Sequence, residues 1–288
     1  MSATSIATYA GATTRQVAAD NRIEYAYRDV GESNVPLVLL QHFRGNLDNW
    51  DPALVDGLAR TRRVITFDNT GVGASTGVTP STVQEMARDA IAFLDSLGIA
   101  KADLLGFSLG SFVVQEVALI RPDLVRRIVL ASSAPQGAED MHGWAPWVID
   151  AVGAPQPTPE NFLKVFFTGS AESRSAGMEF AQRIFGWRTE DRDEQTTWET
   201  RLAQYDAVVA WGIPDHARLQ RVNAIRKPVL VANGDQDPMI LPRYSHLLAG
   251  LLPDARLTIY PDSAHGFLFQ HHVRFARDGT EFLEKSDQ

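Results

Sequence analysis

The sequence contains no cysteine, which excludes disulfide bonds, thiol catalysis and metal sites built on thiolates. It has no uninterrupted apolar run approaching about 18 residues, so no segment is expected to cross a membrane as a helix. The formal net charge is −8 without a run of like charges, which argues against nucleic acid or an anionic membrane surface as a partner. No H-E-x-x-H pattern or cluster of His and Glu predicts a metal centre.

The first residues show neither a basic stretch nor an apolar core of signal-peptide length, so the sequence predicts a cytoplasmic protein. Residues 1–20 are small and polar, and we expect them to form a loose N-terminal tail. The chain has 288 residues, 44% of them hydrophobic and 22% charged, which is enough for a large core in one or two domains. This composition is typical of a globular protein and leaves the oligomeric state open.

Apolar, β-branched runs alternate with amphipathic segments along most of the chain. Such runs are typical of strands that are buried on both faces of a parallel sheet. Their alternation with helices predicts an α/β fold, with a mostly parallel sheet flanked by helices. The predicted strands are residues 23–29, 36–41, 63–67, 102–105, 127–131, 228–232 and 256–260, and the predicted helices are 49–59, 80–97, 109–120, 242–252 and 272–285.

The alternation is interrupted between the strands at 127–131 and 228–232. Residues 137–222 contain no clear parallel strand and hold five of the six tryptophans. We expect this stretch to form a helical cap over the carboxyl edge of the sheet, inserted between core segments 21–136 and 223–288. Most of its aromatic side chains are expected to pack in the cap's own core, with a few facing the cleft.

Residues 106–110 read Gly-Phe-Ser-Leu-Gly, a G-x-S-x-G pattern that follows a predicted strand and opens a predicted helix. In this context the pattern indicates a nucleophile elbow, which presents a serine hydroxyl at the sheet edge. Glycines at both ends let the backbone adopt a strained turn and let strand and helix approach closely. Ser108 is therefore the candidate nucleophile, and a serine in an ordinary strand–helix turn is the alternative.

A serine hydroxyl needs a base that removes its proton and a carboxylate that orients the base. Of the seven histidines, only His265 lies just beyond a late predicted strand, where Gly266 gives the loop freedom to aim the ring. The carboxylate is expected at the end of the strand at 228–232, where Asp235 and Asp237 compete. Asp235 is nearer the strand and is expected to bond its own loop backbone, so Asp237 is the predicted partner of His265.

The reaction also needs hydrogen-bond donors for the oxyanion that develops on the substrate. One predicted donor is the N–H of Leu109, at the start of the helix after Ser108, where the helix dipole favours negative charge. The second donor is expected from the loop after the strand at 36–41, in which residues 41–46 read Gln-His-Phe-Arg-Gly-Asn.

These segments resemble the α/β-hydrolase superfamily, and within it the capped esterases and the cofactor-free haloperoxidase-like proteins. The resemblance covers most of the chain and rests on the elbow, LVLLQHFRGN (37–46), GDQDPMILP (234–242) and SAHGFLFQ (263–270). The family more often has His-Gly-Phe where this oxyanion loop has Gln-His-Phe. The resemblance makes the N–H of Phe43 the second oxyanion donor.

The resemblance implies a metal-independent serine hydrolase, without a cofactor, that cleaves a carboxylic ester or lactone through an acyl-enzyme. Haloalkane dehalogenases and epoxide hydrolases of this fold carry an aspartate at the elbow, so Ser108 indicates acyl transfer instead. An alternative on the same residues is perhydrolysis of a carboxylic acid, seen as cofactor-free haloperoxidase activity. A small-molecule receptor on a hydrolase fold is an alternative of another class.

The aromatic content of the cap suggests a mainly apolar acyl or alcohol group in the substrate. Arg44 lies beside the predicted oxyanion donor and is expected to shape the loop or to form a surface ion pair, and binding of a substrate carboxylate is the alternative. The partner in such a surface pair would be Asp48 or Asp51. The candidate wall residues of the pocket, for which packing in the cap's own core is the alternative, are Trp144, Trp147, Phe166 and Trp211.

Overall fold

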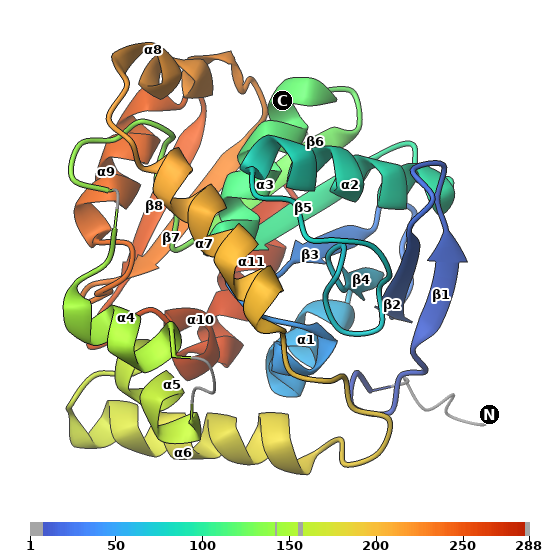
Figure 1. Ribbon diagram of the computed structural model, residues 1–288, viewed down its shortest axis with the longest axis horizontal. Coiled ribbons are helices and arrows are strands. Elements are labelled where there is room, and N and C mark those ends of the chain that lie inside the picture. Colours follow the sequence, from blue (N-terminus) through green and yellow to red (C-terminus); the bar gives the residue numbers. More distant parts are fainter. Residues whose placement is uncertain (1–7, 142, 155–157, 286–288) are drawn as a thin grey trace.

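The computed structural model describes residues 8–141, 143–154 and 158–285 (Figure 1). At its centre the described residues form an eight-stranded sheet in the order β1-β2-β4-β3-β5-β6-β7-β8. Strands β3 to β8 run parallel, and β2 pairs antiparallel with both β1 and β4. The strands are β1 (Arg15–Ala18), β2 (Glu24–Val30), β3 (Leu37–Leu40), β4 (Val64–Phe67), β5 (Ala102–Phe107), β6 (Val125–Ala131), β7 (Val229–Gly234) and β8 (Ala255–Tyr260).

The central strands are mainly apolar because both faces of the sheet are covered. All four residues of β3 and of β4 are buried, as are all six of β5 and of β7. Burying a Val, Leu or Ile side chain contributes about 1.5–3 kcal/mol, so these strands account for much of the core's stability. The mostly parallel sheet expected from the sequence is confirmed.

Helices flank this sheet in contacting pairs. The helix α2 packs beside α3, α1 packs against α11, and α9 contacts β7 and β8. The buried residues of α2 recur at helical spacing, as its sequence predicts. These helices are α1 (Pro52–Ala59), α2 (Val83–Ser96), α3 (Leu109–Ile120), α9 (Pro242–Leu251), α10 (Phe267–Gln270) and α11 (His272–Leu283), and a short 3₁₀ helix, η1 (Leu47–Asn49), precedes α1.

The N-terminal residues differ from the loose tail that composition suggests. Residues 15–18 form β1 at the sheet edge, and Tyr9 is buried. The Tyr9 hydroxyl donates to the Leu47 carbonyl at 2.7 Å, and the Tyr9 N–H donates to Asp56 Oδ1 at 2.7 Å. The expected tail is therefore wrong for residues 9–18, because one aromatic anchor and a four-residue edge strand leave little trace in composition. Residues 1–7 lie outside the described residues.

Between β6 and β7 the described chain is helical, where the sequence predicts an inserted cap. In Figure 1, α4, α5 and α6 lie together at one end of the molecule, and α7 crosses in front of the sheet. We call α4 to α7 the inserted helices. They are α4 (Pro146–Val152), α5 (Pro159–Phe166), α6 (Ala171–Gly186) and α7 (Trp198–Trp211), followed by α8 (His216–Leu219) and the 3₁₀ helix η2 (Gln220–Ala224).

A buried ion pair joins α6 to the core. Arg183 donates from Nε to Asp51 Oδ1 at 2.9 Å and from Nη2 to Asp51 Oδ2 at 2.7 Å. Asp51 also caps α1, because its Oδ1 accepts the Ala53 N–H at 3.0 Å. Removing one partner of such a buried pair costs about 3–5 kcal/mol. The pair therefore fixes the position of α6 relative to the core.

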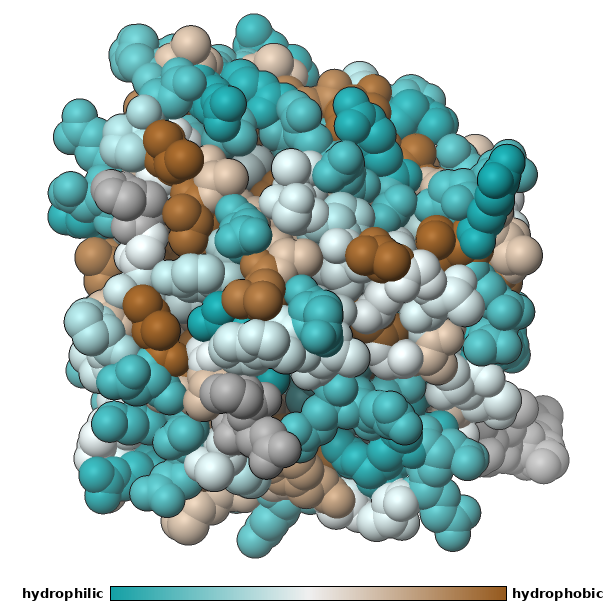
Figure 2. Space-filling model, in the orientation of Figure 1, coloured by the Kyte–Doolittle hydropathy of each residue, from teal (hydrophilic) through white to brown (hydrophobic). Residues whose placement is uncertain are grey.

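The face drawn in Figure 2 is mainly hydrophilic or neutral, and its hydrophobic residues are scattered. Single exposed apolar side chains are normal on protein surfaces, so this face offers no broad apolar patch. Within the described ranges, no helix combines the length and the hydropathy needed to cross a bilayer.

Candidate active site

Ser108 occupies a sharp turn between β5 and α3. Its backbone has φ 55° and ψ −122°, a left-handed region that costs a residue with a Cβ roughly 1–3 kcal/mol. The Ser108 N–H donates to the Ala131 carbonyl of β6 at 2.9 Å, which holds the strained residue at the end of the sheet. The structure therefore has the strand–turn–helix geometry in which a nucleophile elbow presents its serine.

Only glycine fits on either side of this turn. A Cβ on Gly106 would lie 2.4 Å from the Gly110 carbonyl oxygen. A Cβ on Gly110 would lie 2.1 Å from the Leu40 carbonyl oxygen, at the end of β3. Both contacts are to main-chain atoms, which cannot rotate away. The glycines in the sequence pattern are thus explained by the close packing of α3 onto the sheet.

His265 and Asp237 lie together at the ends of neighbouring strands. His265 Nδ1 is 2.8 Å from Asp237 Oδ2, and both side chains are almost fully buried. The other carboxylate oxygen, Asp237 Oδ1, accepts the N–H groups of Met239 at 2.8 Å and Ile240 at 3.0 Å. Asp235 is exposed and accepts the Ser263 N–H at 3.1 Å. The structure therefore gives His265 the aspartate that the sequence analysis prefers.

The loop that carries His265 is hydrogen-bonded to the inserted helix α5. The N–H of Gly266 donates to the Phe166 carbonyl at 2.8 Å, and a Cβ at Gly266 would lie 2.8 Å from that oxygen. The His265 ring packs against Phe107, with ring centroids 5.0 Å apart, and edge-on against Phe166 at 5.3 Å. With Asp237 at Nδ1 and two aromatic rings packed against it, the imidazole has little freedom to rotate.

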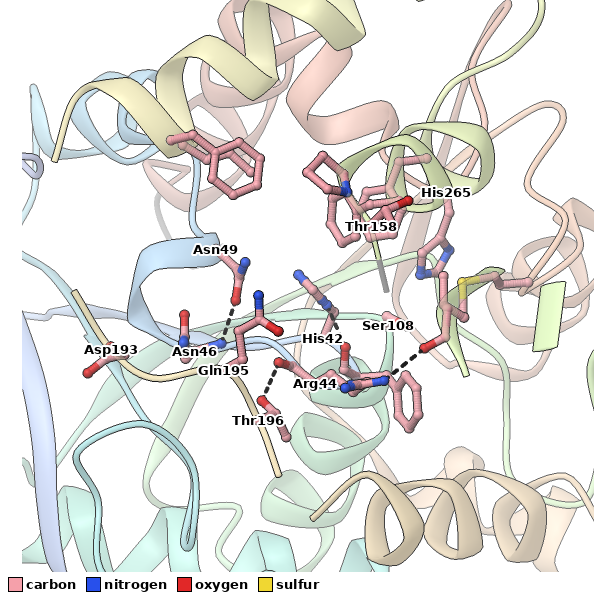
Figure 3. Close-up of a pocket in the computed structure, with 18 of the residues that line it drawn as sticks. His42, Arg44, Asn46, Asn49, Ser108, Thr158, Asp193, Gln195, Thr196 and His265 are labelled. Carbon is pink, nitrogen blue, oxygen red and sulfur yellow. Dashed lines mark hydrogen bonds between the residues drawn. The ribbon is translucent and has the colours of Figure 1, made fainter. Parts of the chain in front are cut away.

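Ser108 and His265 line one cavity of about 410 Å³ (Figure 3). This volume suits a small-molecule substrate. Figure 3 shows Asn46 and Asp193 at the end of the cavity away from Ser108 and His265. Phe166 therefore lies at the His265 end of the cavity, and polar side chains lie at the other end. Its other lining residues are His42, Phe43, Arg44, Asn49, Val152, Thr158, Pro159, Phe162, Phe166, Ile184, Phe185, Arg192, Gln195, Thr196 and Met239.

The loop after β3, where an oxyanion donor is expected, is fixed by its own polar side chains. The Gln41 side chain donates from Nε2 to the Asn46 carbonyl at 2.9 Å and accepts the His42 N–H at 2.9 Å. His42 Nδ1 lies 2.9 Å from the Phe43 carbonyl, and Arg44 has a positive φ of 64°. A loop held in this way is organised before any substrate binds.

The two residues predicted to supply the oxyanion donors are Phe43, in the loop after β3, and Leu109, in α3. Phe43 lines the cavity, and Leu109 is the first residue of α3, directly after Ser108. The first N–H groups of an α-helix have no partner within the helix. The Leu109 N–H is therefore a donor that the helix itself does not use.

His42 is a buried imidazole close to these groups. Burial lowers its pKa to about 3, far below the usual value near 6.5. The hydrogen bond to the Phe43 carbonyl favours the charged form, and the nearby His265 disfavours it. His42 is therefore neutral at physiological pH.

Only one of the four predicted wall aromatics lines the cavity among the described residues. Phe166 does so, whereas Trp211 is buried against Phe112 and donates from Nε1 to the Ala134 carbonyl at 3.1 Å. Trp147 is 41% exposed at the surface, with Lys164 over its ring. The wall role is thus wrong for Trp147 and Trp211. The rotation of each helix about its axis decides which side chains face the cavity, and no clear period in the sequence indicates that rotation.

Trp144 takes an intermediate position. Its ring packs against Phe43 at 5.2 Å and against Tyr205 at 5.5 Å, so it supports the loop after β3. It lies outside the cavity lining among the described residues, and the expected wall role is wrong for it also.

Arg44 lines the cavity, and it also connects the loop after β3 to the end of α4. Its Nη1 donates to the Ala154 carbonyl at 2.6 Å and to the Val152 carbonyl at 3.4 Å. A surface ion pair with Asp48 or Asp51 is disfavoured, because Asp48 already pairs with Arg28 and Asp51 with Arg183. These contacts favour the loop-shaping role that the sequence analysis considers.

Several lining residues are absent from the sequence-based expectations. Phe162 precedes Phe166 by one helical turn, and their rings stack at 3.8 Å, so helical spacing from Phe166 would have found it. Arg192, Asp193 and Gln195 come from the connection between α6 and α7, and this irregular segment carries no sequence signal for facing a cavity.

Comparison with known proteins agrees with this geometry. A sequence profile of the α/β-hydrolase fold matches residues 35–272. The chain belongs to the α/β-hydrolase fold family. A similar solved structure is an α/β-hydrolase fold protein from Chitinophaga pinensis, at 39% sequence identity and a TM-score of 0.90, and the likeness covers 97% of this chain and all of the other. The family that the sequence motifs imply is confirmed.

Two further relatives of this chain have lower sequence identity. A Mycobacterium tuberculosis protein provisionally named a non-heme bromoperoxidase is 27% identical over 266 residues, covering 86% of this chain and 93% of the relative. An Azorhizobium caulinodans protein provisionally named a carbamate hydrolase is 26% identical over 257 residues, covering 84% of this chain and 88% of the relative. The first supports the likeness to the haloperoxidase-like branch, and the pair shows that relatives of this chain carry names for different chemistries.

Proposed function

We propose that the protein is a serine hydrolase that cleaves a carboxylic ester or lactone of a mainly apolar small molecule through an acyl-enzyme. The observation that carries the proposal is the buried His265–Asp237 contact of 2.8 Å, together with the strained Ser108, which lines the same cavity as His265. A serine alone in a tight turn would need neither partner.

In the proposed mechanism, Ser108 Oγ attacks the substrate carbonyl while His265 Nε2 takes its proton. Asp237 holds Nδ1–H and stabilises the imidazolium that forms. The N–H groups of Phe43 and Leu109 stabilise the oxyanion. His265 then gives the proton to the leaving alkoxide, and water releases the acyl group by the same steps.

A panel of p-nitrophenyl esters of graded chain length, together with several lactones, tests this proposal. Wild-type protein should turn over at least one of them and react covalently with a fluorophosphonate. Ser108→Ala should abolish labelling and lower kcat/KM by about 10⁴-fold or more, with an unchanged melting temperature. Activity of Ser108→Ala within tenfold of wild type would exclude the serine mechanism. Folded wild-type protein that resists the fluorophosphonate would favour a receptor.

Perhydrolysis of a carboxylic acid is a second candidate, supported by the name of the Mycobacterium tuberculosis relative. It uses the same three side chains, with hydrogen peroxide in place of water as the nucleophile that receives the acyl group. Initial rates with acetate and peroxide distinguish the two reactions. Peracid formation slower than hydrolysis of the best ester at matched concentrations would favour the esterase.

A further inference from the structure

His42 presents an unusual group to the cavity. The residue is only 4% exposed, and its ring lies among three aromatic rings, with centroid distances of 5.3 Å to Phe107, 5.8 Å to Phe162 and 5.5 Å to Phe166. Phe107 and Phe166 are also the rings that pack on His265, so the two imidazoles share their surroundings. Figure 3 draws His42 among the lining side chains with its bond to Phe43.

The hydrogen bond at Nδ1 decides the tautomer. A carbonyl oxygen can only accept, so the Nδ1 that lies 2.9 Å from the Phe43 oxygen must carry the proton. The neutral ring then has a lone pair on Nε2. The low pKa caused by burial keeps the ring in this form over the physiological range. His42 is therefore a hydrogen-bond acceptor at Nε2.

This acceptor has no partner among the described residues. Leaving a buried acceptor unpaired is unfavourable, and proteins generally satisfy such atoms. The surrounding aromatic rings offer no strong donor, and the ring lines the same cavity as Ser108. A molecule bound in this cavity is therefore the candidate donor for Nε2.

We propose that His42 Nε2 accepts a hydrogen bond from a hydroxyl or N–H group that the substrate carries next to its scissile carbonyl. The inference rests on the proposed function of Ser108. We place this donor group next to the scissile carbonyl for two reasons. His42 directly precedes Phe43, the proposed oxyanion donor, and its ring packs against the same aromatic rings as His265. The favoured substrate class is therefore an ester of a 2-hydroxy or similarly donor-bearing acid, with an apolar remainder.

The first test compares phenyl esters of 2-hydroxybutanoic, 2-methoxybutanoic and butanoic acids, followed by phenol release. Wild type should prefer the 2-hydroxy ester over both others in kcat/KM, by about tenfold or more. His42→Asn keeps a donor near the Phe43 carbonyl but lacks the Nε2 acceptor. His42→Phe keeps the ring packing and lacks both nitrogens. Each variant should lose the preference, whereas His246→Asn, the same change on the exposed face of α9, should retain it.

Fluorophosphonate labelling and melting temperature identify any His42 variant that fails to fold, and one folded variant is enough for the comparison. A wild type without preference for the hydroxy ester, or a folded His42 variant that keeps the preference, overturns the proposal. Equal preference for the hydroxy and methoxy esters also overturns it, because a methoxy oxygen cannot donate.

A second test separates the acceptor from the reaction. Calorimetry on Ser108→Ala compares binding of 2-hydroxybutanoate and butanoate, which needs no turnover. Tighter binding of the hydroxy acid, lost in Ser108→Ala/His42→Asn, supports the acceptor even if no ester is cleaved. No advantage for the hydroxy acid, whether both or neither bind, overturns it. Failure of the proposed function would instead appear as the absence of ester turnover and of labelling.

Discussion

Substituting Asp237 by Asn tests the His265–Asp237 pair through the tautomer of the histidine. In the structure, Oδ1 of Asp237 accepts two main-chain N–H groups, from Met239 and Ile240, while Oδ2 faces His265 Nδ1. An asparagine can place its oxygen on one side only. Facing the oxygen toward the two N–H groups keeps two hydrogen bonds, each worth about 1 kcal/mol net, whereas the opposite orientation keeps one and forces NH₂ against two N–H donors. The amide NH₂ will therefore face His265.

An NH₂ group at that position must donate, so His265 Nδ1 must become the acceptor and Nε2 must carry the proton. The ring then cannot remove the proton of Ser108. In serine triads this tautomer change costs about 10⁴-fold in turnover, which corresponds to about 5 kcal/mol of barrier. We expect the same loss in kcat for Asp237→Asn at pH 7–8, together with slow fluorophosphonate labelling. The melting temperature should change little because the two main-chain hydrogen bonds remain.

Asp235→Asn is the matched control, since it is the same substitution two residues away. Asp235 is exposed, and the asparagine oxygen can still accept the Ser263 N–H. Its kcat for a p-nitrophenyl ester should stay within a few-fold of wild type. The tautomer argument fails if Asp237→Asn retains more than about a tenth of wild-type kcat. It also fails if Asp235→Asn is the more damaging change while both proteins stay folded.

Three further predictions follow. Phe162→Ala should shift the preferred acyl chain to greater length, with about a fourfold gain in kcat/KM per added CH₂. Trp147→Ala, at the surface, should leave the dependence of kcat/KM on chain length unchanged. The same chain-length dependence in both variants would show that Phe162 is not part of the cavity wall. Gly110→Ala should lower the melting temperature and prevent fluorophosphonate labelling, because its Cβ would meet a main-chain oxygen of β3 at 2.1 Å; labelling at the wild-type rate would contradict the close packing. Burial, and then the charge of Asp193, raise the pKa of the Asp68 carboxyl well above its usual range. Above about pH 4 the folded state therefore keeps a proton on Asp68 that the unfolded state releases. The free energy of unfolding consequently falls as the pH rises from there. Asp193→Asn should therefore flatten the decline of melting temperature between pH 5 and 8, and an unchanged slope would refute this linkage.

The sheet and the elbow could be predicted from sequence because their signals are local. A strand buried on both faces must be apolar along its whole length, and β3, at residues 37–40, is an apolar run of this kind. The G-x-S-x-G pattern reports a steric condition, since a Cβ at Gly106 or Gly110 would collide with main chain. The places of Asp237 and His265 follow from strand order, as each comes just after a strand of the parallel sheet.

The cavity lining could not be predicted in the same way. Whether Trp147 faces the cavity depends on how α4 is rotated about its axis, and a helix of seven residues has too few turns to fix that rotation from its pattern. The role of His42 depends on a single hydrogen bond, from Nδ1 to the Phe43 carbonyl, that sets the tautomer. The sequence shows the departure from the family's usual His-Gly-Phe, and only the folded loop shows that it creates an acceptor.

The wall of the cavity and the support of the proposed base meet in one residue. The Phe166 carbonyl accepts the Gly266 N–H at 2.8 Å, and the Phe166 ring packs edge-on against His265. The stacked neighbour Phe162 contacts Phe166 and His42 but lies one turn further from the His265 loop. A change of side chain at Phe166 therefore alters the packing of the base along with the shape of the cavity. Substrate specificity can therefore vary more freely at Phe162 than at Phe166, since Phe166 both lines the cavity and packs against His265.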